Sequence, residues 1–257
     1  MTRQSFKTLA VAPLALVAGL ILFQPRVLAD DLELTGLLPS GFSMGGVYTS
    51  PYLISVNYGT PSIMFACDDF KTDINFGYAW TANEVYLSDV SAITGPQKFE
   101  TAVAVFIPGA DGTTPTVHPP YSILQEYDAA AYLAEQLLGT DSSIRDNSEL
   151  AGEYSFAIWQ IFDSGAVNGW NGNYPLTDTQ KAAVGVLMTT AFSYTGSLTD
   201  MYLYTPAPRT SSQEFIGLDP LSIASVPEAP TPALLAFNSL ALCGVLFLLR
   251  RRSLRTS

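Results

Sequence analysis

The stretch Ser148–Phe162, with the sequence SELAGEYSFAIWQIF, decides how the middle of this chain folds. Its apolar residues recur every three or four positions, so a helix places them on one face. These residues are Leu150, Tyr154, Ala157, Ile158 and Ile161. Because such a face must be covered by other elements, the stretch predicts a helix packed into a core.

Two further helices are predicted on either side of this stretch. Ser122 and Gln125 form a capping-box pattern that predicts a helix start, and Gly139 predicts its end. A second capping box, Thr177 with Gln180, predicts a helix that runs to about residue 192.

Strand signals come before and after the helices. Residues 32–107 hold short alternating runs, among them 47–49, 52–56 and 62–66, and the loop 108–115 closes this section. A strand signal returns at 201–204 and again at 214–216. This order predicts an α+β domain with a β-rich N-terminal section, about three amphipathic helices and a short C-terminal strand return.

The first 29 residues have the layout of a secretory signal peptide. Arg3 and Lys7 precede an apolar stretch over 9–23, and Val27-Leu28-Ala29 offers the small residues that a signal peptidase reads. We expect the mature chain to begin at Asp30. An uncleaved N-terminal anchor is the alternative.

The last residues predict a membrane segment. The motif Val226-Pro227-Glu228-Ala229-Pro230 is followed by an apolar run over 233–249 and by a basic end, 250–257, that includes Arg250, Arg251 and Arg252. As a helix the run is about 25 Å long, which is the short limit for one transmembrane span. The arginines favour a cytoplasmic end, so the rest of the chain is expected on the far side.

This tail, residues 226–257, resembles the PEP-CTERM sorting region of exported bacterial proteins. The resemblance implies recognition and removal of the tail by exosortase, then release into the outer envelope or the extracellular polysaccharide. Ala229 separates Glu228 from Pro230, where the commonest form of the motif has them adjacent. A plain tail anchor that is never cut is the alternative.

The predicted exported domain, residues 30–225, is strongly acidic. It carries 22 acidic and five basic residues. Nucleic acid is excluded as a partner, because phosphate binding needs clustered Lys and Arg. High acidity is compatible with divalent cations, although its commonest meaning is solubility outside the cell.

Cys67 is the only cysteine of this domain, and Cys243 lies in the predicted membrane helix. No disulfide within the domain is therefore available. Three explanations for Cys67 are open: a buried bystander, an intermolecular disulfide or a reactive group.

Ala66-Cys67-Asp68-Asp69-Phe70, followed downstream by Ala157-Ile158-Trp159, is similar to the thioester domains of bacterial surface adhesins. In that family the cysteine bonds to the Gln of a Thr-Gln-x-Ala-aliphatic-Trp segment, and the thioester captures amines. Here Ser155 occupies the Gln position, and a serine cannot supply the acyl carbon. Gln160 points to another side of the helix, which leaves Gln136 and Gln180 as substitutes only if the fold brings them to Cys67.

Other constellations are weaker. Asp68, Asp69 and Asp163 are the weak calcium candidates, but no stretch matches an EF-hand loop, and no metal or cofactor is expected. His118, the single histidine, sits in a predicted turn, and a hydrolase would have to use it. Trp170 and Tyr174 lie among amides in a Gly-rich loop and are candidate sugar-binding residues, unless Trp170 folds back over the helices.

The sequence therefore predicts a non-enzymatic, exported cell-surface or matrix protein with a structural or binding role. Signal peptidase and exosortase are its expected processing partners, and the inner membrane holds it before processing. Exopolysaccharide, as in a biofilm, and other surface proteins are the candidate binding partners. A covalent thioester adhesin using Cys67 is the alternative, and a secreted hydrolase is the third class.

Overall fold

The structure is a computed structural model that describes residues 29–38, 42–49, 51–58, 62–87, 97–102, 104–139, 141–196, 198 and 201–218. The sorting motif, the basic end and residues 1–28 lie outside these ranges, as does the predicted span 233–249. Within the described ranges, no helix is both long and apolar enough to cross a membrane.

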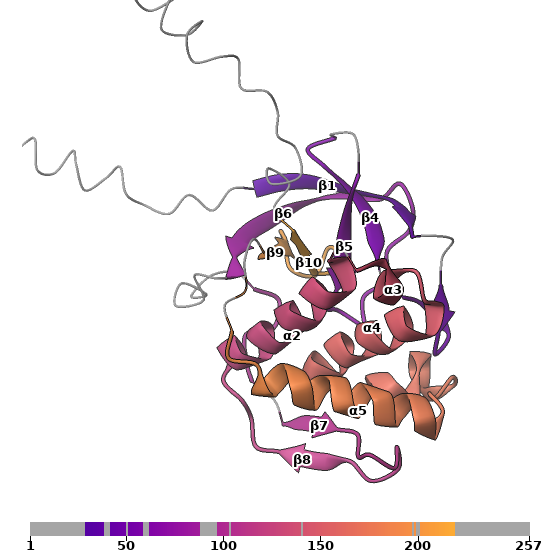
Figure 1. The fold of residues 1–257 in the computed structure, drawn as a ribbon. Helices are drawn as coiled ribbons and strands as arrows, with labels where there is room; N and C mark the ends of the chain where they lie inside the picture. Colours follow the sequence, from indigo (N-terminus) through magenta and orange to yellow (C-terminus); the bar gives the residue numbers. More distant parts are fainter. Residues whose placement is uncertain are drawn as a thin grey trace, which may run out of the picture.

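Six strands form a closed barrel in the order β1-β4-β5-β10-β9-β6, and every neighbouring pair is antiparallel. Figure 1 shows this barrel on one side of the helices. The strands are β1 (Ala29–Leu37), β4 (Tyr52–Val56), β5 (Ile63–Cys67), β6 (Ala79–Tyr86), β9 (Met201–Pro206) and β10 (Phe215–Leu218).

The C-terminal strands complete the barrel. β5 and β6 follow each other along the chain, but β10 and β9 lie between them, with Phe215 opposite Cys67 and Tyr204 opposite Glu84. The expected strand return is confirmed. This return closes the N-terminal strands into one barrel, which the sequence did not predict.

Four α-helices are described: α2 (Ile123–Leu138), α3 (Ser142–Arg145), α4 (Ser148–Phe162) and α5 (Asp178–Ser193). Both predicted capping boxes are present, with Ser122 at the start of α2 and Thr177 at the start of α5. The helix α4 has the predicted bounds. The one-turn helix α3 was not predicted, because four residues are too few to show a helical period.

Two small hairpins border the helices. β2 (Ser43–Met44) pairs with β3 (Val47–Tyr48), and β7 (Val105–Ile107) pairs with β8 (Thr116–His118). In Figure 1 the β7–β8 hairpin lies on the side of the helices away from the barrel. His118 therefore ends a strand, whereas the sequence predicted a turn.

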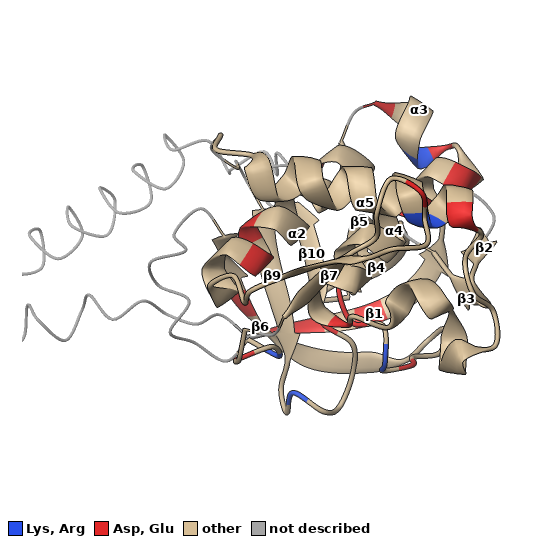
Figure 2. Cartoon of the chain, turned by 90° about the horizontal axis from the view of Figure 1, so that it is seen from below, with Lys and Arg blue, Asp and Glu red and all other residues tan. Residues whose placement is uncertain are grey.

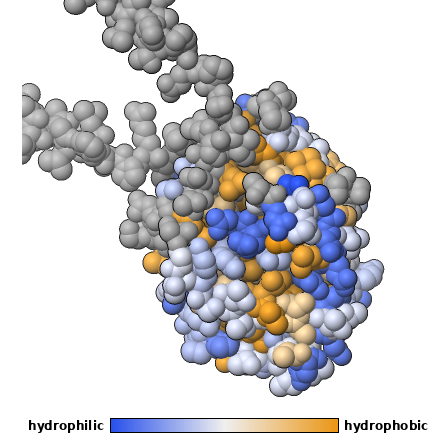
Figure 3. All heavy atoms as spheres, in the orientation of Figure 1, coloured by the Kyte–Doolittle hydropathy of each residue, from blue (hydrophilic) through white to orange (hydrophobic). Residues whose placement is uncertain are grey.

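The core lies between the barrel and α2, α4 and α5, which pack on one another. Its largest fully buried side chains come from both layers, and they include Phe65, Tyr204 and Phe215 from the barrel and Tyr127 and Phe156 from the helices. Acidic residues are spread over β1, α2 and the α3–α4 region, and few basic residues accompany them (Figure 2). On the face in Figure 3, apolar residues reach the surface among polar ones.

Candidate functional site

Cys67 lies at the end of β5, where the barrel meets α4. Its side chain is fully buried. The thiol donates a hydrogen bond to the Asp69 carbonyl oxygen at 3.3 Å, and the Asp69 N–H donates back to the sulfur at 3.4 Å. The chain thus turns tightly around the sulfur immediately after the strand.

This environment keeps the thiol protonated. Burial raises the pKa of Cys67 well above its usual value, and the nearby carboxylates of Asp69 and Asp68 raise it further. The Asp69 backbone and the Trp159 side chain act in the opposite direction but do not outweigh burial. Because the thiolate is the nucleophile, a buried thiol with a raised pKa is expected to react slowly with added reagents.

The helix α4, which packs against β5, carries Ser155 and Trp159, both buried. The Ser155 hydroxyl donates to the Ala151 carbonyl at 2.9 Å, one turn back along the helix. A hydroxyl here has no acyl carbon to offer. Of the other glutamines that the sequence considered, Gln180 caps the start of α5, and Gln160 donates to the carbonyls of Phe106 and Ser164.

The carboxamide beside Cys67 belongs to Gln213, which the sequence reasoning did not consider. Gln213 is 8% exposed, and it precedes β10, the strand that pairs with β5. Its Nε2 donates to the Asp69 carbonyl oxygen at 3.2 Å and also contacts the Thr72 carbonyl. The Asp69 oxygen is the acceptor that the Cys67 thiol also uses, so both side chains reach one atom.

No protein-family model matches the chain, and no curated protein matches it in sequence. Among solved structures, it is similar to the N-terminal thioester domain of a surface protein from Clostridium perfringens, with a TM-score of 0.41 and 14% identity over 73% of this chain and 97% of that one. It is also similar to the N-terminal thioester domain of the fibronectin-binding protein SfbI from Streptococcus pyogenes, with a TM-score of 0.40 and 8% identity over 77% of this chain and 96% of that one.

A pilus-presented adhesin gives a TM-score of 0.44 at 15% identity, over 76% of this chain and 49% of the adhesin. The present chain thus spans about half of that protein. Thioester domains of bacterial surface proteins are therefore among the structural neighbours. At this distance the likenesses assign no residue role to this chain.

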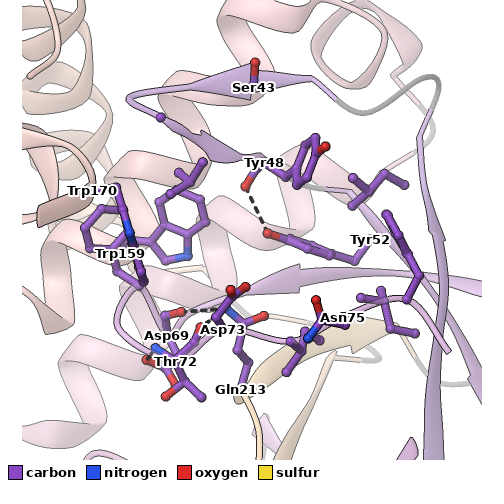
Figure 4. A pocket seen from close by; sticks show the side chains of 17 residues that line it. Ser43, Tyr48, Tyr52, Asp69, Thr72, Asp73, Asn75, Trp159, Trp170 and Gln213 are labelled. Carbon is purple, nitrogen blue, oxygen red and sulfur yellow. Dashed lines mark hydrogen bonds between the residues drawn. The ribbon is translucent and has the colours of Figure 1, made fainter. Parts of the chain in front are cut away.

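A cleft of about 570 Å³ is lined in part by Asp69 and Phe70, which follow β5, and by Gln213 (Figure 4). Trp159 and Trp170 lie at one side of it, and Tyr48 and Tyr52 at the other, with the Tyr52 hydroxyl donating to the Tyr48 carbonyl at 2.9 Å. Polar side chains also line it, among them Ser43, Asp73, Asn75 and Gln213. The cleft therefore combines apolar ring faces with hydrogen-bonding groups.

The two candidate sugar-binding residues have different positions. Trp170 is partly buried; its ring packs edge-on against Phe70 at 5.9 Å while it lines the cleft. Tyr174 is 58% exposed and does not line the cleft; its ring covers Gly46 of the β2–β3 hairpin. Of the two, the structure brings Trp170 to the cleft.

The three calcium candidates lie in separate interactions. Asp69 pairs with Lys98, and Asp163 pairs with Lys71 at 3.2 Å. Asp68 is fully buried beside Glu214. Burial raises the pKa of Asp68 most, and the Glu214 carboxyl raises it further. Among the described residues, no group of three or more His, Cys, Asp or Glu side chains could hold a metal ion.

His118, at the end of β8, contacts a neighbouring tyrosine. Its ring stacks on Tyr121, and its Nδ1 lies 3.3 Å from the Tyr121 hydroxyl. The contact is local, because Tyr121 follows His118 by three positions. Nothing in this pair activates a nucleophile.

A buried polar cluster beside Cys67 was also missed by the sequence reasoning. The Glu214 carboxyl accepts hydrogen bonds from the Tyr127 hydroxyl at 2.5 Å, from the Lys98 N–H at 2.7 Å and from the Thr205 hydroxyl. Glu214 was expected only as part of a strand signal.

Proposed function

We propose that this chain is an exported cell-surface or matrix protein whose described domain binds a carbohydrate-type ligand without covalent chemistry. The observation that carries the proposal is the cleft lined by Trp170, Tyr48 and Tyr52. Its volume of about 570 Å³ falls within the range of small-molecule sites.

The chemistry of the cleft suits a sugar. Aromatic ring faces pack against the apolar faces of a pyranose, and the side chains of Asp73, Asn75 and Gln213 offer donors and acceptors for hydroxyl groups. The acidic domain disfavours a polyanionic ligand. We therefore expect a neutral or amine-bearing polysaccharide, one or two units of which enter the cleft.

Export and sorting belong to the same proposal. Signal peptidase removes residues 1–29, the inner membrane holds the span 233–249, and exosortase then cuts near Val226–Pro230. The intact mass of the protein recovered from its own host tests this. A mass that begins at Asp30 and ends near Pro230 is expected, and one that retains Arg250–Arg252 contradicts sorting.

Ligand binding is tested by calorimetric titration of the host's own exopolysaccharide into the purified protein. Trp170→Ala and Tyr48→Ala are each expected to weaken binding about 2- to 13-fold, which is what the loss of one ring contact of about 0.5–1.5 kcal/mol gives. Tyr58→Ala is the matched control, because Tyr58 is 65% exposed and does not line the cleft. Equal effects at Tyr48 and Tyr58 would exclude the cleft as the binding site.

A second candidate function is covalent capture of amines through Cys67. The observation that favours it is the Asp69 oxygen shared by the Cys67 thiol and the Gln213 carboxamide. Attack of the sulfur on the Gln213 carbonyl carbon would form a thioester and release ammonia, and a ligand amine would then take the acyl group and restore the thiol. The intact mass would be lower by one ammonia, and methylamine would abolish the deficit.

A further inference from the structure

Lys98 and Asp69 form a buried pair next to the Cys67 turn. The lysine side chain is 15% exposed and the aspartate side chain 3%. The Lys98 Nζ contacts Asp69 Oδ2, and it donates to Thr72 Oγ1 and to the Ser212 carbonyl oxygen, each at 2.8 Å. Three acceptors thus hold the Lys98 amine against the Asp69 carboxyl group.

The second oxygen of Asp69 is held separately. Asp69 Oδ1 accepts two backbone hydrogen bonds, from the Lys71 N–H at 3.1 Å and from the Thr72 N–H at 3.2 Å. Two fixed N–H donors on one carboxyl oxygen stabilise negative charge that develops there when a nucleophile adds to the carbon. The two oxygens of this carboxyl group therefore have distinct surroundings: Oδ1 faces N–H donors, and Oδ2 faces the amine.

The surroundings are also poor in water and hold a proton. Asp68 and Glu214 are both fully buried. Within the described residues, the side-chain oxygens of Asp68 have no hydrogen-bond donor if Asp68 and Glu214 are both ionised. If the two carboxyl groups share one proton, one of them donates a hydrogen bond to the other. Burial raises the pKa of both groups, so a proton stays in the pair beside Asp69.

We propose that Lys98 and Asp69 condense into an intramolecular amide, an isopeptide bond that ties residue 98 to the end of β5. The Lys98 nitrogen adds to the Asp69 Cγ, Oδ1 becomes the amide oxygen, and Oδ2 leaves. The ammonium and the carboxylate together contain the atoms of one amide and one water. One of the three Nζ hydrogens stays on the amide nitrogen, and the other two leave on Oδ2, so the step needs no oxidant, nucleotide or cofactor.

The condensation is favoured by the burial of the pair. An ion pair in a low-dielectric interior keeps a large desolvation cost, and the amide removes both charges. Asp69 and Thr72 also line the cleft, which gives the released water a way out. The bond closes a covalent loop between residues 69 and 98 in a domain whose only cysteine is Cys67. It gives an exported protein the constraint that a disulfide gives elsewhere.

The chain contains its own control pair. Lys71 and Asp163 lie 3.2 Å apart, but the Lys71 side chain is 76% exposed. Asp163 Oδ1 accepts a single backbone N–H, from Gly165 at 3.1 Å. Water surrounds this lysine, and the pair has one fixed donor where Asp69 has two. We expect Lys71 and Asp163 to remain an ordinary ion pair.

Tryptic peptide mapping of the denatured full-length protein tests the bond. The expected product is a branched peptide that joins the segment ending at Lys71 to residues 72–145. Its mass is one water below the sum of the two segments, and trypsin does not cut it after Lys98. Free peptides 72–98 and 99–145, together with an unmodified Asp69 peptide, would overturn the proposal and leave a buried ion pair. Cleavage after Lys71 serves as the internal control in the same digest.

Two variants keep the result decisive. Lys98→Arg preserves the positive charge and abolishes the branched peptide. Asp69→Asn is expected to form the same bond with loss of ammonia, so its linked product has the mass of the wild-type linked product; an ion pair alone cannot give this. The amide bond survives methylamine and denaturant, whereas a Cys67 thioester does not. The amide proposal and the thioester proposal can therefore fail independently.

Discussion

Cys67 and Gln213 donate to one acceptor, the carbonyl oxygen of Asp69, at 3.3 and 3.2 Å. The two residues come from β5 and from the segment that enters β10, and the pairing of Phe215 with Cys67 brings them together. The thiol is thus placed beside a carboxamide even though Ser155 occupies the expected Gln position on α4.

We expect iodoacetamide to leave Cys67 unlabelled in the folded protein at neutral pH and to label it after denaturation. The reagent needs an accessible thiolate, and burial both raises the thiol pKa and blocks access. Mass spectrometry of the peptide that contains Cys67 measures the labelled fraction.

Methylamine separates the two reasons for low labelling. If labelling of the folded protein rises after methylamine treatment, a Cys67 thioester was present, and Gln213→Ala should then abolish the effect. If methylamine changes nothing, Cys67 is a buried thiol. Fast labelling of the untreated folded protein would contradict the buried position of the sulfur.

Tyr127→Phe is expected to lower the free energy of unfolding by about 1–3 kcal/mol. The Tyr127 hydroxyl donates to Glu214 Oε1 at 2.5 Å and accepts from the Phe99 N–H at 3.2 Å, so its removal leaves buried polar atoms without partners. Urea denaturation measures the change. Tyr121→Phe is the control, because among the described residues its hydroxyl meets only His118, at 3.3 Å in a partly buried position. An equal loss there would contradict a special role for the Tyr127 hydroxyl.

The helices were predictable because their signals are local. The capping boxes at Ser122 and Thr177 and the apolar period of Ser148–Phe162 each lie within one element, so helix starts and the bounds of α4 follow from neighbouring residues. The strand Tyr52–Val56 was also predicted with its observed bounds, because its residues favour an extended backbone.

Barrel closure and the polar cluster were not predictable in the same way. Whether β10 pairs with β5 depends on contacts between distant parts of the chain, and β5 and β6 gave no sign that other strands separate them. Gln213 and Glu214 acquire their partners through that register. Trp170 was considered from its loop composition, but the cleft that it lines needs residues from the β2–β3 hairpin as well.

Stability is expected to fall as the pH rises above about 4, the ordinary range of carboxyl groups. Asp68 and Glu214 have pKa values raised above those of the unfolded chain, about 3.9 and 4.3, so the folded state binds more protons than the unfolded state above these values. The contribution is complete below about pH 4 and is lost as the pH rises through the folded pKa values. Asp111, with a pKa lowered to about 2, has the opposite sign, but its effect ends below this window.

Urea denaturation at several pH values measures this slope, and Glu214→Gln supplies the control. The variant removes one member of the buried pair while keeping a side chain of similar shape, so the slope is expected to flatten. A wild-type slope that is zero or positive between pH 5 and 8 would show that the pair is ionised in the folded protein. The same result would mean that Asp68 and Glu214 hold no proton beside the Lys98–Asp69 pair.

Gly112→Ala is expected to destabilise the protein more than Gly77→Ala. Both glycines have a left-handed backbone, with φ of +70° and +75°, so each substitution costs about 1–2 kcal/mol of conformational strain. A Cβ at Gly77 meets nothing within 4 Å, whereas one at Gly112 would lie 1.9 Å from the Asp178 carbonyl oxygen at the start of α5. The β7–β8 loop must then move off the helix, which adds about 1–3 kcal/mol. Urea denaturation compares the two variants, and equal losses would mean that this loop does not rest on α5 in solution.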